Sequence, residues 1–230
     1  MRVAFLSEGA TEVGFAPGMR EHEPWRKTFL LKIIVDRILD IDDEVLVPLE
    51  EESLPSLSGN AVGKLCRKGA GLVRACAGFG AEAAVLLVDR DRTKPRERLG
   101  ALRVQRDRLR AGPKRPLPIP VAVGVAVETV EAWLLADEVT VCDVLGLAHP
   151  ESPMGSPERL VGAPGEATHP KYVLNNYFSQ DADPQRTFLD RVAAVALRMN
   201  LDTVARQCPQ GFGQFRDDVL HEFRPCLGRA

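Results

Sequence analysis

The sequence lacks any long apolar stretch. No apolar run approaches the roughly 20 residues that a transmembrane helix needs. The short apolar run near the N-terminus, from Val3 to Leu6, is too short for a secretory signal peptide and is typical of a strand. Neither secretion nor membrane insertion is expected, and we predict a soluble cytoplasmic protein without a membrane partner.

The chain also lacks a cysteine framework. Its five cysteines are an odd number, and no two of them have C-x-x-C spacing. We interpret them as buried thiols in a reducing cytosol, and not as disulfides or zinc ligands.

The chain also has no large excess of positive or negative charge, but its charges are unevenly distributed. The net charge is −2, yet residues 90–115 contain eleven basic and three acidic residues, which gives +8 there and −10 for the remainder. A cationic segment on an acidic protein indicates a polyanionic partner, here nucleic acid. The segment is rich in Arg and poor in aromatic residues, which favours phosphate contacts over base stacking. The alternative is a solvated helix face.

Short apolar runs alternate with helical patterns in the first half of the chain. We predict strands over residues 3–6, 44–49, 83–88 and 119–127, and helices over residues 29–39, 61–77 and 96–110. This alternation predicts an α/β fold with a mostly parallel sheet of about four strands flanked by helices. Beyond residue 128 the patterns are helical, over residues 129–137, 169–178, 185–199 and 214–223. We therefore predict a first domain over residues 1–137 and a helical C-terminal module over 138–230 packed on it.

Three acidic residues follow two of the predicted strands. Glu8 comes after the first strand, and Asp89 and Asp91 come after the third. Functional groups in open α/β sheets gather outside the carboxyl ends of the strands, so these carboxylates are expected to meet in one crevice. Carboxylate oxygens are the ligands that Mg²⁺ prefers, and Mn²⁺ accepts the same ligands. The alternative is that these acids are helix caps or solvated loop residues.

The same residues carry a family resemblance. Residues 6–12 (LSEGATE), followed about eighty residues later by residues 87–92 (LVDRDR), resemble the Toprim domain of topoisomerases, primases and OLD-type nucleases. Within that superfamily the chain is most similar to the small bacterial group called domain of unknown function 4276. Further matches to that group are residues 128–137 (ETVEAWLLAD), His169-Pro170-Lys171, and Cys208-Pro209 with Phe212 and Phe215.

The resemblance implies a Toprim-like, Rossmann-like fold and a catalytic site made of Glu8, Asp89 and Asp91. It places Glu8 as the catalytic glutamate and the two aspartates as ligands of Mg²⁺. Such a metal ion bridges phosphate oxygens, while the glutamate transfers a proton or holds a second ion. The implied activity is a Mg²⁺-dependent nuclease on DNA or RNA in a bacterial defence module, with a separate ATPase as a further partner.

Several other residues are candidates for the same site. Glu128 is a candidate fourth metal ligand, and Glu131 lies three residues later, where it would share a helix face with Glu128. The alternative is an acidic pair favoured by the helix dipole. Glu12 is a candidate supporting residue, although the long segment over residues 10–28 leaves its reach open.

Basic residues near these acids are candidates for binding phosphate. Arg90, Arg92 and Lys94 adjoin the two aspartates, where the arginines would also compete with a metal ion. Lys171 opens a predicted helix after a flexible loop, and His169 is a candidate supporting residue beside it. The alternative is that Lys171 is solvated and His169 caps the helix.

Two other functions compete with the nuclease. One is a non-catalytic subunit that binds nucleic acid or a nucleotide. The other is a nucleotidyl-transfer enzyme acting on a small substrate, which the modest net charge favours because dedicated duplex-binding proteins are usually more basic.

Overall fold

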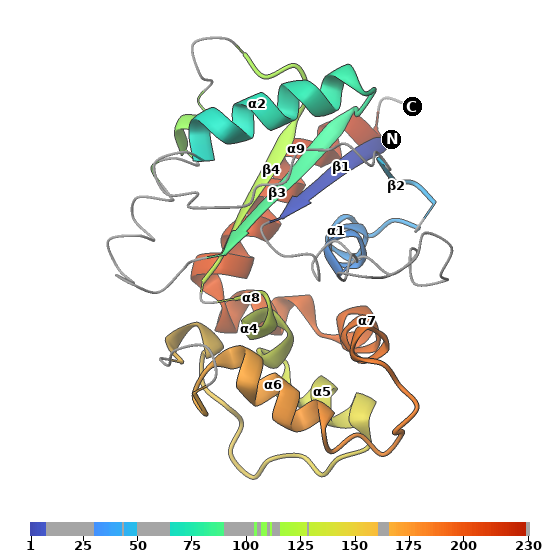
Figure 1. Ribbon diagram of the computed structural model, residues 1–230, viewed down its shortest axis with the longest axis vertical. Helices are drawn as coiled ribbons and strands as arrows, with labels where there is room; N and C mark the ends of the chain where they lie inside the picture. The colour runs from blue at the N-terminus through green and yellow to red at the C-terminus, as the bar shows by residue number, and fades with distance from the viewer. Residues whose placement is uncertain are drawn as a thin grey trace.

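The computed structural model describes residues 1–7, 30–42, 44–49, 65–89, 104, 107–109, 111, 116–127, 129–160 and 166–228 (Figure 1). Four parallel strands form one sheet in the order β2-β1-β3-β4. The strands are β1 (Arg2–Ser7), β2 (Val47–Pro48), β3 (Ala83–Asp89) and β4 (Val121–Ala126). The sheet confirms the predicted α/β class with about four parallel strands.

Helices cover both faces of this sheet. On β3, Ala84, Leu86 and Val88 belong to the buried cluster that also contains residues of α2 (Leu65–Gly78). The alternate residues of β3 pack in a second cluster with α1 (Leu30–Leu39) and α9 (Gln214–Leu227). Because both faces are buried, the strand is a continuous apolar run from Ala83 to Val88.

The helices that follow β4 lie on the side of the sheet toward which the strands point (Figure 1). They are α4 (Glu131–Leu135), α5 (Glu138–Leu145), α6 (Pro170–Phe178), α7 (Phe188–Arg198) and α8 (Leu201–Gln207), with a short 3₁₀ helix over Pro157–Arg159 and a π-helix over Pro209–Gly213. Of the main helices in this group, α5 and α8 were not predicted. In the described part of the chain, no helix is both long and apolar enough to cross a membrane.

The last helix, α9, returns along the sheet and joins the C-terminal region to the main core. The indole of Trp133 in α4 stacks on Phe215 and meets the edge of Phe212, with ring centroids 5.4 Å apart in each pair. Asp218 of α9 is buried, and its carboxylate accepts a hydrogen bond of 3.3 Å from the N–H of Val123 in the edge strand β4. The sheet and the C-terminal helices therefore share one core, and the division at residue 137 stays a prediction.

Two predicted elements differ from the structure or fall partly outside it. The strand predicted over residues 44–49 is only Val47–Pro48, at the edge of the sheet. Pro48 has no N–H to donate, and such residues are confined to edge positions. Of the helix predicted over residues 96–110, residues 104 and 107–109 are described and helical, and the others lie outside the described residues.

Candidate functional site

The candidate site begins where three neighbouring parallel strands end. In the sheet register, Ser7 at the end of β1 pairs with Leu87 of β3, and Asp89 at the end of β3 pairs with Ala126 at the end of β4. All three strands therefore end at the same edge of the sheet. In sequence, the next residue after Ser7 is Glu8, and the second residue after Ala126 is Glu128.

Most of the predicted metal ligands and phosphate-binding residues lie outside the described residues, either entirely or with their side chains. Asp89 is described by its backbone alone, and its side chain lies outside the described residues. Also outside them are Glu8, Glu12, Arg90, Asp91, Arg92, Lys94 and Glu128. Their roles stay predictions. Within the described ranges, no group of three or more His, Cys, Asp or Glu side chains is arranged to hold a metal ion.

Two candidate residues from distant parts of the sequence come together beyond β4. Glu131 is the first residue of α4, and Lys171 is the second residue of α6. Lys171 Nζ lies 4.0 Å from Glu131 Oε1, with side-chain exposures of 57% and 9% respectively. The sequence pattern groups Glu131 with Glu128 and gives no sign of its pairing with a lysine.

His169 holds the start of the helix that carries Lys171. It is the N-cap of α6, and its Nδ1 accepts a hydrogen bond of 3.1 Å from the N–H of Lys171. An accepting Nδ1 places the proton of a neutral ring on Nε2. Pro170 occupies the first helical position, where its missing N–H costs nothing. His169 is buried and caps the helix, so it fixes the position of the Lys171 backbone.

Sequence reasoning missed a cluster that fixes the π-helix against the end of β4. The carboxylate of Glu158 accepts hydrogen bonds from the N–H groups of Gly211, at 2.6 Å, and of Gln210, at 3.1 Å. A Cβ atom at Gly211 would lie 2.6 Å from Glu158 Oε1 and 3.0 Å from the carbonyl oxygen of Val125. Position 211 therefore requires glycine. The Gly-Phe-Gly run after Cys208-Pro209 was the only sequence signal for this close approach.

Some buried polar atoms near this edge have no hydrogen-bond partner among the described residues. They include the hydroxyl oxygen of Thr129, between β4 and α4, and the indole nitrogen of Trp133. The carboxylate of Glu131 is paired with Lys171, which is its only charged partner among the described residues. Buried polar groups are normally paired, and the partners of these atoms are not among the described residues.

Three of the five cysteines are buried thiols with raised pKa values. Burial raises the pKa of the Cys76, Cys142 and Cys208 thiols, so they stay protonated at neutral pH. The Cys208 thiol donates to the carbonyl oxygen of Ala132, with the two atoms 3.6 Å apart. Of the five predicted buried thiols, these three are free and buried, Cys226 is free but only half-buried, and the side chain of Cys66 lies outside the described residues.

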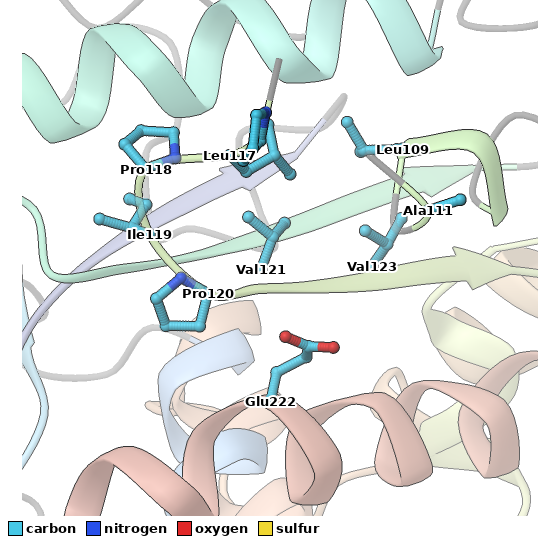
Figure 2. Close-up of a pocket in the computed structure, with 10 residues that line it drawn as sticks. Leu109, Ala111, Leu117, Pro118, Ile119, Pro120, Val121, Val123 and Glu222 are labelled. Atoms are coloured by element: carbon cyan, nitrogen blue, oxygen red, sulfur yellow. The ribbon is translucent and has the colours of Figure 1, made fainter. Parts of the chain in front are cut away.

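A separate pocket of about 550 Å³ lies at the other end of β4 (Figure 2). Its walls are mainly apolar and include Leu117, Ile119, Val121 and Val123, with Glu222 of α9 below them. Val121 is the first residue of β4, so this pocket opens near the amino end of the strand. It is therefore distinct from the carboxyl edge.

Comparison with known proteins gives no relative from which to assign a function. No protein-family model, no curated protein and no solved structure matches this chain.

Proposed function

We propose that this protein is a Toprim-like, Mg²⁺-dependent enzyme that acts on phosphodiesters, a nuclease on DNA or RNA. The observation that carries the proposal is the common edge at which β1, β3 and β4 end. Asp89 is the last residue of β3, and Glu8 directly follows the last residue of β1. Ligands in open α/β sheets bind outside this edge.

The donor set suits a hard divalent cation. Glu8, Asp89 and Asp91, with Glu128 as a fourth, offer carboxylate oxygens, the donors that Mg²⁺ and Mn²⁺ prefer. The Thr129 hydroxyl, which adjoins Glu128 in sequence and has no hydrogen-bond partner among the described residues, supports a ligand at this edge. When bound, the metal ion would supply charge neutralisation on the phosphate oxygens.

Other residues of the chain would bind and orient the substrate. Glu8 would take a proton from the attacking water or hold a second ion. Lys171, with an exposed ammonium group, would contact a phosphate as a point charge. Arg90, Arg92 and Lys94 would do so beside the aspartates, and the remaining basic residues of segment 90–115 would contact the phosphate backbone further along a strand.

The test is metal titration followed by cleavage assays. Mg²⁺ and Mn²⁺ are titrated by calorimetry into the wild type, Glu8→Ala, Asp89→Ala and the control Glu151→Ala, and each protein is then incubated with plasmid DNA and with RNA. Glu151 is exposed and lies in the segment after α5, far in sequence from the ends of the strands. We expect both site variants to lose metal binding and to cleave roughly 100-fold more slowly or worse, because removing one group that stabilises transition-state charge costs this much.

Each other outcome has a definite meaning. Cleavage retained in Glu8→Ala and Asp89→Ala, with unchanged melting temperatures, would contradict the site. Metal binding without cleavage would favour a small nucleotide substrate or a required partner such as an ATPase. Nucleic-acid binding that persists in EDTA without metal binding would favour a non-catalytic binding subunit.

A further inference from the structure

The contact between Lys171 and Glu131 is an ion pair without a hydrogen bond. Their charged atoms are 4.0 Å apart, whereas N–H···O hydrogen bonds rarely exceed about 3.2 Å. An ammonium group has three N–H donors. The described residues take none of them, so the ammonium of Lys171 is tethered by charge and still free to donate to a ligand.

The two partners are in very different environments. The Glu131 side chain is only 9% exposed, whereas that of Lys171 is 57% exposed. A buried carboxylate without a charged or hydrogen-bonded partner is costly, so Glu131 attracts the only cation that the described structure brings near it. The exposed ammonium has no comparable need, because water solvates it well. The pair therefore constrains the lysine more than it stabilises the fold.

The position of Lys171 in its helix also indicates that the pair constrains the lysine. It occupies the first turn of α6, where the positive end of the helix dipole disfavours a cation. The capping bond from its N–H to His169 fixes its backbone, and Glu131 at the start of α4 restrains its side chain. Both restraints come from residues beyond the carboxyl end of β4, which is the edge that the proposed function uses.

We propose that Glu131 is a positioning residue, which holds the ammonium of Lys171 at the carboxyl end of β4 so that it contacts a phosphate of a nucleic-acid strand. This inference rests on the proposed function. A lysine side chain loses rotamer entropy when it is ordered. A side chain that is already restrained loses less of this when the ligand binds, which increases affinity.

The test measures binding separately from cleavage. Fluorescence anisotropy with 20-nucleotide single-stranded DNA and RNA is recorded in Ca²⁺ between 50 and 300 mM salt, for wild type, Lys171→Met, Glu131→Gln and the double variant. Arg224→Met is the matched control, since Arg224 is exposed in the last turn of α9, near the amino ends of the strands. Melting temperatures are measured for every variant.

We expect Lys171→Met to weaken binding about 5- to 10-fold and to reduce the slope of log Kd against log salt by about 0.7, as the loss of one phosphate contact on a single strand does. Glu131→Gln should weaken binding about 3-fold and also lower the slope, although the lysine is still present. In the Lys171→Met background, Glu131→Gln should have no further effect. A purely structural role for Glu131 would change the melting temperature and leave the salt slope unchanged.

Other results would overturn the inference. Glu131→Gln that tightens binding would show that the carboxylate opposes the ligand, and an equal loss in both backgrounds would show that it acts independently of Lys171. If Glu131→Gln does not fold, Glu131→Asp keeps the charge on a shorter side chain, and an unchanged affinity in that variant contradicts positioning. Wild-type protein that neither binds nor cleaves nucleic acid overturns the proposed function, whereas a wild type that cleaves while the variants bind normally overturns this inference alone.

Discussion

Gly124 shows how closely α9 approaches the sheet. A Cβ atom at this position would lie 2.6 Å from Leu87 Cδ1 and 2.9 Å from Phe215 Cδ2. Gly124→Ala is therefore expected to lower the free energy of unfolding by about 1–3 kcal/mol, the usual cost of overpacking a core. Urea denaturation followed by circular dichroism measures the change.

Gly71 is the matched control for this substitution. It lies inside α2, is exposed, and has nothing within 4 Å of the place where a Cβ atom would be. Gly71→Ala should increase the free energy of unfolding by about 0.5–1 kcal/mol, because alanine loses less backbone entropy in a helix. Equal effects at both positions would contradict the packing of Phe215 against β4.

Asp181 makes stability depend on pH. Burial of this carboxyl group acts to raise its pKa, but hydrogen bonds from Arg191 and from the N–H of Asp183, with the charge of Arg186, outweigh burial and hold the pKa below its ordinary value. A lowered pKa in the folded state gives stability that is present above the ordinary value and lost as the pH falls through the folded value. Its side chain is 2% exposed, and Arg191 Nε lies 2.6 Å away.

We predict that Asp181→Asn lowers the free energy of unfolding by about 1.5–3 kcal/mol at pH 7, which is what hydrogen bonds to a charged group contribute. The cost should shrink as the pH falls from 5 toward 2, because the wild type then loses the same charge. Urea midpoints measured across this range check it. Asp183→Asn is the control: this side chain is 49% exposed and pairs with Arg186 at 3.5 Å, so a loss below about 1 kcal/mol is expected.

At the scale of elements, α7 begins at a capping box. The Thr187 hydroxyl accepts a hydrogen bond of 3.2 Å from the N–H of Asp190, and the Asp190 carboxylate accepts one of 2.8 Å from the N–H of Thr187. Both hydrogen bonds satisfy backbone donors that a helix start leaves unpaired. The Thr187 hydroxyl also donates a hydrogen bond of 2.7 Å to the Asp190 carboxylate, and this bond, followed by the one from the N–H of Thr187, is the main cause of the lowered pKa of Asp190.

Thr187→Ala is expected to reduce the free energy of unfolding by about 1 kcal/mol, as the loss of an N-cap hydroxyl does. Thr187→Ser keeps the hydroxyl and should lower the free energy of unfolding by only a few tenths of a kcal/mol. Amide hydrogen exchange should show faster opening of the first turn of α7 in the alanine variant. Similar exchange in both variants would mean that packing alone holds this helix start.

Helix α5 shows why some elements could not be predicted. Its sequence, EVTVCDVL, is rich in the β-branched residues that favour strands. The residues at its two ends favour the helix instead. Asp137 caps the start by accepting from the N–H of Thr140, and Gly146 ends the helix in the left-handed region with φ of 70°. Such caps outweigh weak propensities over short segments.

At the scale of the whole molecule, the sheet depends on residues near the C-terminus. Phe212, Phe215, Val219 and Phe223 are fully buried in the same cluster as residues of β1, β3 and β4. A fragment of residues 1–137 would expose that face of the sheet. It is therefore expected to aggregate or to unfold without a cooperative transition, which thermal melting with light scattering measures. A fragment that melts cooperatively would instead support an independent first domain.

The sequence alone determined the α/β class, the parallel sheet and most of the helices, although not α5 and α8, because apolar alternation over neighbouring residues sets which face each element buries. It also put acidic residues at the ends of strands. Only the tertiary structure decided the contacts between distant residues. Glu131 meets Lys171, and Phe215 meets Gly124, because α6 and α9 fold back on segments far away in the chain. Such contacts depend on how whole elements pack, and no local pattern records that.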